Sequence, residues 1–183
     1  VAVCENGNYY NRFYFVHPDG AVQHYDKKHL FTFGGEHKRF TAGTERVVVN
    51  FRGVRILLEV CYDLRFPVWS RNLGDYDMIL YVASWPTPRV DAWSALLRAR
   101  AIENQCYVAG VNRMGTDPTC EYSGGSAIID PYGKTIAECP WSRESAVSAD
   151  IDMEALQAFR KKFPVLDDAD PFTSVSYTHL TLP

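Results

Sequence analysis

Residues 56–67 read Ile-Leu-Leu-Glu-Val-Cys-Tyr-Asp-Leu-Arg-Phe-Pro, an aliphatic run that stops abruptly at a cysteine and a polar turn. The run from Val54 to Val60 is rich enough in aliphatic and β-branched side chains to form a buried strand, and residues 62–67 cannot continue it. Cys61 therefore stands where backbone amides become free of strand pairing. We expect a strand that presents a nucleophile beside amides able to form an oxyanion hole.

The residues before this strand predict a hairpin followed by a loop. Two aromatic-rich runs, 9–16 and 21–26, flank His17-Pro18-Asp19-Gly20, which has the proline and glycine positions of a type I turn. The hairpin leads directly into Lys27. Residues 31–43 mix glycine, charge and aromatics without a period, which predicts a loop over a site. A strand is expected at 46–51.

The residues after it predict alternating strands and helices. Residues 77–83 form a second continuous apolar run, typical of a strand covered on both faces. A helix is expected from Asp91, which would cap it, with a core stripe of Trp93, Leu96, Leu97 and Ala101. Further strands are expected at 106–111, 126–129, 135–137 and 146–151, a polar loop at 112–123, and a helix at 152–162 capped by Asp152. This order predicts the α/β class.

Composition limits the partners of the chain. A length of 183 residues with 46% hydrophobic content fits one domain. A net charge of -3, from 19 basic and 22 acidic residues, offers no basic stripe for nucleic acid and no membrane patch. No apolar run approaches the roughly 20 residues of a membrane helix. We therefore expect small-molecule and subunit partners, and a cytoplasmic location.

The cysteines argue against a disulfide framework and against zinc. There are five, at widely spaced positions without a Cys-x-x-Cys pair: Cys4, Cys61, Cys106, Cys120 and Cys139. This pattern favours a reducing compartment and predicts no metal or other cofactor. All but Cys61 are expected to be buried as small apolar side chains.

Several motifs together resemble the nitrilase (carbon–nitrogen hydrolase) superfamily. They are Tyr-Asp-Lys-Lys-His-Leu-Phe at 25–31, Gly35-Glu36 and the run at 61–67, with further matches at 83–86, 98–105 and 125–133. Residues 34–37 and 66–72 are most similar to the omega-amidase branch. The resemblance implies a four-layer α-β-β-α sandwich, a homodimer or larger assembly, and a Glu-Lys-Cys triad that cleaves a small amide without a cofactor.

The same resemblance assigns roles to individual residues. Cys61 would be the nucleophile, and Lys27 would lower the pKa of the thiol and stabilise an oxyanion with the amide of Tyr62. Strand alternation allows only one of Lys27 and Lys28 to reach the site. Glu36 matches a second glutamate that positions the lysine or the hydrolytic water, and the alternative is an exposed acid.

Other residues have two interpretations. Trp85 is expected either to form a pocket wall or to be an ordinary core tryptophan. Asp63 and Arg65 are expected to make structural pairs behind the nucleophile. Glu59, in an otherwise apolar strand, requires a partner, for which an arginine is favoured over a place at the border of the site.

The triad glutamate itself has no match in this sequence. The resemblance places it well before the lysine, and the chain opens at Val1 in what is predicted to be mid-strand, so an N-terminal part is expected to be missing. We expect a partial hydrolase domain at 1–173 and a non-native or disordered tail at 174–183. The alternatives are another amidase or a nitrilase, a papain-like Cys61–His29 pair, or a catalytically incomplete binding or assembly module.

Overall fold

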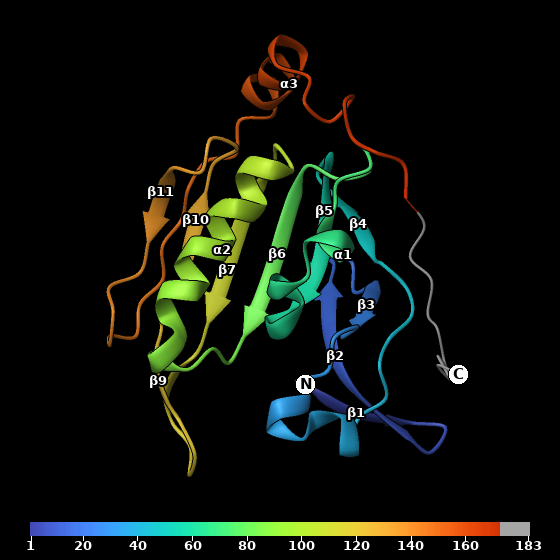
Figure 1. Cartoon of the computed structure of the whole chain (residues 1–183), viewed down its shortest axis with the longest axis vertical. Coiled ribbons are helices and arrows are strands. Elements are labelled where there is room, and N and C mark those ends of the chain that lie inside the picture. Colours follow the sequence, from blue (N-terminus) through green and yellow to red (C-terminus); the bar gives the residue numbers. More distant parts are fainter. Residues whose placement is uncertain (173–183) are drawn as a thin grey trace, which may run out of the picture.

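The computed structural model describes residues 1–172 and is organised around a six-stranded sheet of order β11-β10-β7-β6-β5-β4 (Figure 1). The central strands β5 (Val54–Val60), β6 (Met78–Ala83) and β7 (Tyr107–Asn112) are parallel. Flanking strands β4 (Val48–Phe51), β10 (Ala127–Ile129) and β11 (Thr135–Glu138) pair antiparallel. Strand β5 has the predicted bounds. The tail predicted at 174–183 lies outside the described residues.

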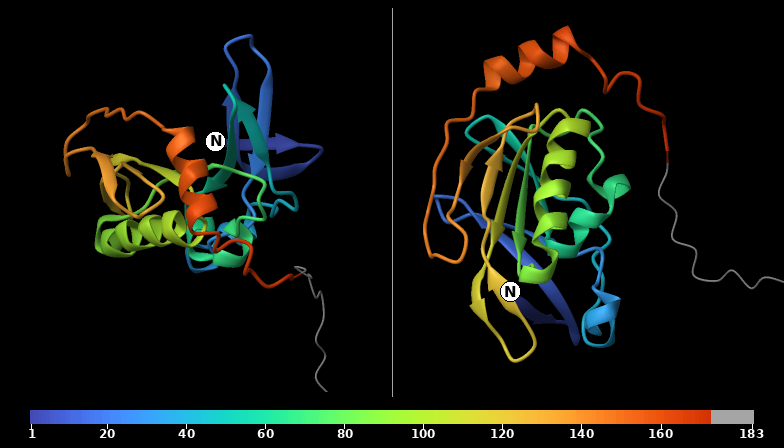
Figure 2. Two further views of the ribbon diagram at one scale, coloured as in Figure 1. Left: turned by 90° about the horizontal axis from the view of Figure 1, so that it is seen from above. Right: turned by 60° about the vertical axis from the view of Figure 1, so that its left-hand side comes forward.

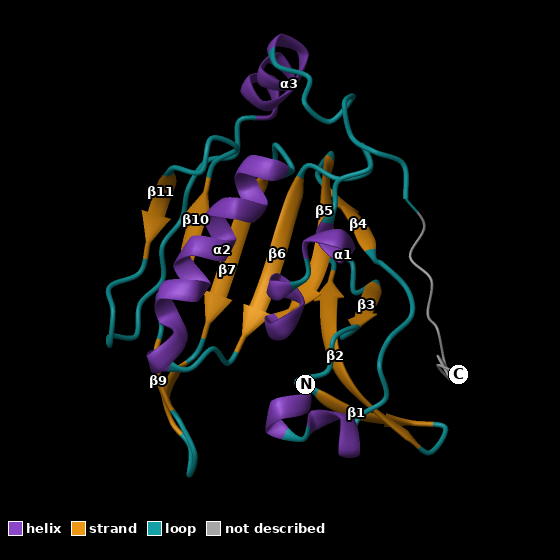
Figure 3. Cartoon of the chain, in the orientation of Figure 1, coloured by secondary structure: helices purple, strands orange, loops and turns teal. Residues whose placement is uncertain are grey.

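Helices α1 (Pro67–Ser70) and α2 (Val90–Glu103) lie on one face of this sheet (Figure 3). Trp93, Leu97 and Ala101 are buried as predicted. Gly110 of β7 allows α2 to approach, since a Cβ there would lie 2.6 Å from Leu97 Cδ1.

The predicted cap of this helix is wrong. Helix α2 begins at Val90, and no side chain caps it. A 3₁₀ turn at Thr87–Arg89 leads directly into the helix, which places Asp91 inside its first turn.

A second sheet packs on the other face. Strands β1 (Ala2–Glu5), β2 (Asn8–Val16) and β3 (Val22–Asp26) are antiparallel and include the predicted hairpin. Phe13, Phe15 and Tyr25 pack with Ile56 and Leu58 of β5. The described residues therefore contain a helical layer and two sheets, and no helix within 1–172 covers the outer face of the second sheet (Figure 2).

Two predictions beyond β7 require correction. The predicted loop at 112–123 contains a hairpin of β8 (Met114–Thr116) and β9 (Glu121–Ser123). Residues 146–151 form no strand, because this mostly exposed run buries too little apolar surface to stabilise sheet pairing. Helix α3 (Met153–Lys162) is capped as predicted, with Asp152 accepting from the Ala155 amide at 2.8 Å.

Glu59 is fully buried behind β5 without an arginine ion pair, contrary to prediction. Its Oε2 accepts from Ser70 Oγ at 2.9 Å, and its Oε1 has no partner among the described residues. Burial first, and the charge of Asp63 second, raise the pKa of Glu59 to about 8. The folded protein therefore favours the neutral acid.

Replacing Glu59 by glutamine should stabilise the protein more at pH 8 than at pH 5. The pKa of Glu59 is higher in the folded protein than in the unfolded chain, where it is 4.5. Its contribution to the free energy of unfolding is therefore complete below pH 4.5 and declines as the pH rises towards 8. Glutamine does not ionise, so the Glu59→Gln protein lacks this decline. Its free energy of unfolding, relative to that of the unmodified protein, should therefore increase by on the order of 2 kcal/mol between pH 5 and pH 8. Urea unfolding at both pH values measures it. Glu138→Gln, at an exposed position, is the control, and identical pH dependence of Glu59→Gln and unmodified protein would contradict the prediction.

Candidate active site

A pocket of about 420 Å³ opens at the carboxyl ends of β5 and β6. Ligand sites in sheets with parallel strands are commonly found at this end. All five residues predicted for the site line the pocket: Lys27, Glu36, Cys61, Tyr62 and Trp85. They come from four separate segments, which the fold brings together.

Cys61 is the first residue after β5 and begins a 3₁₀ turn at Cys61–Arg65. Its φ of 49° is left-handed, a conformation unusual for a residue with a side chain. The half-buried thiol has its Sγ 3.9 Å from the Ser84 carbonyl oxygen. Burial raises the pKa of Cys61 and outweighs the lowering by Lys27. The predicted lowering of the thiol pKa by Lys27 is therefore present, but the effect of burial is larger and favours the protonated thiol.

Lys27 and Glu36 form a tight ion pair inside the pocket. Lys27 Nζ lies 2.6 Å from Glu36 Oε2, and the lysine side chain is only 3% exposed. Lys28 instead lies over the Trp69 ring at 5.2 Å, so only Lys27 reaches the pocket, as predicted. The predicted reason is wrong, because β3 ends at Asp26 and neither lysine lies in a strand. Gly35 enables this arrangement with a φ of 74°, which turns the chain so that Glu36 points back to Lys27.

Glu36 accepts three hydrogen bonds. Besides Lys27, its donors are Phe31 N at 2.6 Å and Asn11 Nδ2 at 2.9 Å. Burial opposes ionisation, but these donors together hold the pKa of Glu36 below its ordinary value. Glu36 is the only carboxylate lining the pocket within residues 1–172, and a carboxylate held by three donors is a poor proton acceptor.

Tyr62 and Trp85 form apolar walls. The Tyr62 ring packs edge-on against Phe31 and Phe66 at 5.0 and 5.1 Å between centroids. Trp85 is 3% exposed, so both of its predicted interpretations hold: it is a core residue and it lines the pocket. Asn112 fixes the backbone of Trp85, since its side chain accepts from Trp85 N at 2.7 Å and donates to Trp85 O at 3.0 Å.

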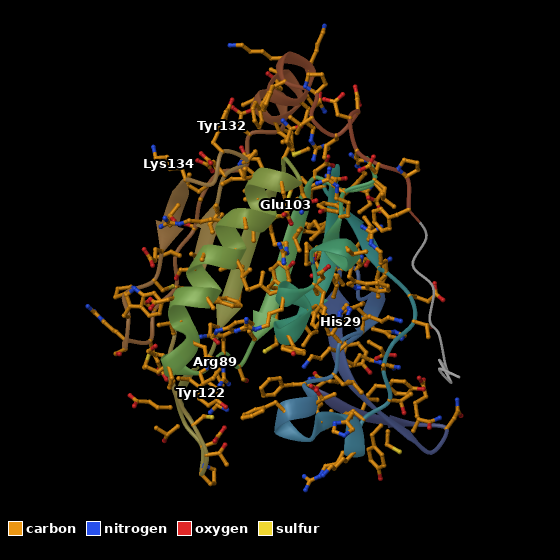
Figure 4. The ribbon with its side chains drawn as sticks, viewed as in Figure 1. His29, Arg89, Glu103, Tyr122, Tyr132 and Lys134 are labelled. Carbon is orange, nitrogen blue, oxygen red and sulfur yellow. The ribbon has the colours of Figure 1, made fainter. Side chains whose placement is uncertain are left out.

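Sequence analysis missed four polar residues of the pocket: Asn11, Arg65, Ser84 and Arg89. Arg65, predicted to be structural, is exposed, and its guanidinium lies 5.0 Å from the centre of the Trp85 ring. Arg89 lies at the start of α2 (Figure 4), 5.6 Å from the centre of the Phe31 ring. Neither arginine forms an ion pair within residues 1–172. Their positions after β5 and β6 could have pointed to them.

The other cysteines only partly follow prediction. Cys106 and Cys139 are buried, but Cys4 is exposed and Cys120 is half-buried. Within residues 1–172, no cluster of three or more His, Cys, Asp or Glu side chains has the spacing to hold a metal ion. No helix in the same range is long and apolar enough to cross a membrane.

A thiol at a strand end, a buried lysine–glutamate pair and an open pocket define a candidate cysteine hydrolase. Residues 1–161 match the family model for carbon-nitrogen hydrolase, and the chain belongs to this family. The nitrilase-type α/β fold predicted from the sequence is confirmed by the same match and by solved relatives.

The relatives include omega-amidases. The chain is 53% identical over 173 residues to Omega-amidase YafV of Escherichia coli, covering 94% of this chain and 68% of that protein. It is 41% identical to 2-oxoglutaramate amidase of Bacillus subtilis, covering 92% and 66%. A crystal structure of XC1258 from Xanthomonas campestris, a CN-hydrolase superfamily protein with an arsenic adduct in its active site, superposes with a TM-score of 0.92 at 46% identity, covering 96% and 69%.

Proposed function

We propose that this protein hydrolyses the side-chain amide of a small dicarboxylic acid monoamide, such as a 2-oxo-acid amide, to the free acid and ammonia. The observation that carries the proposal is the joint placement of Cys61, the Lys27–Glu36 pair and two arginines around one pocket. Among residues 1–172, neither arginine has an ion-pair partner. The similarity to proteins named omega-amidase and 2-oxoglutaramate amidase supports this substrate class.

In the proposed reaction, Cys61 Sγ attacks the amide carbon and forms a tetrahedral intermediate. The Lys27 ammonium and the Tyr62 amide stabilise its oxyanion. The C–N bond then breaks, the nitrogen takes the thiol proton and leaves as ammonia, and a thioester remains. Water attacks the thioester, releases the acid and restores the thiol. Glu36 orients Lys27.

The arginines would select substrates with a second, ionised carboxylate. Arg65 and Arg89 supply positive charge at the pocket from two different turns, and both have donors available for an anion. Glu36 does not compete for them, because it is engaged by Lys27, Phe31 and Asn11. A nitrile or neutral amide would not use this charge, which favours the monoamide over the other substrates of the family.

Removing either charge should weaken binding of the monoamide specifically. Arg65→Gln and Arg89→Gln are each expected to raise KM for a dicarboxylic monoamide by about 10- to 100-fold, as for a lost charged hydrogen bond. The kcat/KM for a neutral amide of equal length should stay the same. Arg98→Gln, at an exposed position of α2, is the matched control. Equal losses on both amides would contradict the proposed selectivity.

The second candidate is a binding or assembly module. The observation that favours it is that Glu36, the only pocket carboxylate of residues 1–172, is already held by three donors. Ammonia release from 2-oxoglutaramate separates the two candidates: turnover that requires Cys61 supports the hydrolase, and tight binding without turnover supports the module.

The proposal extends to location and assembly. Unpaired cysteines support a reducing, cytoplasmic compartment. A homodimer is supported by the family resemblance. Light scattering on the purified protein tests the dimer.

A further inference from the structure

A single buried carboxylate connects the lysine segment to the nucleophile turn. Asp63 is completely buried, and each of its oxygens accepts two hydrogen bonds. Oδ1 accepts from His29 N at 2.9 Å and lies 2.8 Å from His29 Nδ1. Oδ2 accepts from Tyr25 Oη at 2.9 Å and from Val60 N at 3.0 Å. Asp63 does not line the pocket.

The hydrogen-bond donors to Asp63 lie close in sequence to both reacting residues, Lys27 and Cys61. Tyr25 and His29 stand two residues before and two residues after Lys27, so Asp63 holds the chain on both sides of the lysine. Val60 immediately precedes Cys61, so the same carboxylate fixes the backbone where the thiol turn begins. Lys27 and Cys61 are 34 residues apart in sequence, and Asp63 sets their relative position.

The donors are themselves held rigidly. The His29 ring (Figure 4) stacks on Phe66 with centroids 3.8 Å apart and planes at 5°. Tyr25 Oη accepts from Lys28 N and from Trp69 Nε1, each at 3.1 Å. Because the donors cannot turn away, a side chain at position 63 must offer four acceptor sites, which an ionised carboxylate supplies and an amide does not.

We infer that Asp63, with His29 as its main partner, is the positioning residue that sets the geometry of Cys61 relative to Lys27. The inference rests on the proposed function, in which these two groups act on one carbonyl. Its role is indirect, since Asp63 does not touch substrate. The sequence predicted that Asp63 makes structural pairs behind the nucleophile, and its partners are Tyr25, His29 and Val60.

The test replaces Asp63 by asparagine and measures alkylation of Cys61 by iodoacetamide against pH. The titratable groups that act on this thiol are Lys27, Glu36 and Asp63. Loss of the Asp63 charge alone would lower the pKa of the Cys61 thiol, whereas movement of Lys27 away from the thiol raises it. If Lys27 is displaced, alkylation at pH 7.5 should slow about tenfold and its pH profile should move upward. Ammonia release should lose about 10²-fold in kcat, with KM nearly unchanged, as for a small misplacement of reacting groups.

Asp77→Asn is the matched control. Asp77 is also a buried carboxylate with several donors, from Arg55 and Arg160, and it lies just before β6, at the opposite end of the sheet from Cys61. A merely structural role would make both variants less stable, leave the Asp77→Asn alkylation profile unchanged and move the Asp63→Asn profile downward or not at all. A folded Asp63→Asn protein with an unmodified or lowered profile would therefore overturn the inference.

A second variant covers the case in which Asp63→Asn does not fold. His29→Phe keeps a ring for stacking on Phe66 and keeps the backbone bond to Asp63, but removes the Nδ1 donor at a site that is 23% exposed. A partial upward shift of the profile is expected, and no shift would overturn the inference. Alkylation needs no amide substrate, so this result stands apart from the ammonia assay that tests the proposed function.

Discussion

The Cys61→Ala protein is expected to release ammonia from a dicarboxylic monoamide on the order of 10³-fold more slowly than the unmodified protein, or not at all. Without Sγ, no thioester can form, and the oxyanion donors act only on direct attack by water. The fold should persist, because Cys61 is half-buried at the edge of the core and Cys61→Ala removes one sulfur atom whose hydrogen bond, to the Ser84 carbonyl at 3.9 Å, is weak. Coupled ammonia assays and thermal unfolding of both proteins measure these two expectations.

Cys4→Ala is the control for this experiment. Cys4 is exposed on β1, so its loss should change neither activity nor unfolding. If Cys61→Ala and the unmodified protein release ammonia equally fast, the nucleophile assignment is wrong. Incubation with substrate followed by acid quenching and mass spectrometry should find the acyl group on Cys61.

Replacing Lys27 by methionine is expected to lower kcat by about 10²- to 10³-fold, comparable to removing one oxyanion donor. Methionine has similar length but no charge, so the oxyanion loses its cation and Glu36 loses its ion-pair partner, at 2.6 Å. The pH profile of Cys61 alkylation should also move upward, since Lys27 is the largest influence lowering the pKa of the thiol.

Lys28→Met provides an adjacent control. The Lys28 ammonium lies over Trp69, outside the pocket, and the bond from its backbone amide to Tyr25 is not altered by the substitution. Its kcat should remain within about twofold of the unmodified value, as for surface substitutions. A similar loss of kcat in the Lys27→Met and Lys28→Met variants would show that the reaction depends on positive charge near the site and not on the position of Lys27.

The strands that carry the site were predictable because their pattern is local. The run at 54–60 is a strand with the expected bounds, and the hairpin that leads to Lys27 forms as expected, although it ends at Asp26, before the two lysines. Such features depend on side chains one or two positions apart, where the two-residue period of a strand decides the outcome. The strand predicted at 146–151 does not form, because the sequence pattern resembles a strand but most of its side chains remain exposed.

The rest of the site depends on contacts between distant segments. No local pattern shows that Asn11 supports Glu36, 25 residues away, or that Arg89 meets Phe31 over the pocket. The resemblance supplied Glu36 as a candidate, and the fold supplied its three donors. Glu59 illustrates the same limit, because its neighbours Ser70 and Tyr81 form a buried cluster that arises only when β5, α1 and β6 pack.

The placement of Arg65 and Arg89 has a consequence for how this scaffold can diversify. Each lies on its own short turn after a strand and forms no ion pair within residues 1–172, so its replacement removes little that holds the fold. The bond-breaking groups lie deeper, on segments with dense hydrogen bonding. Substrate preference can therefore drift, by selection or by laboratory evolution, while the reaction chemistry is inherited unchanged.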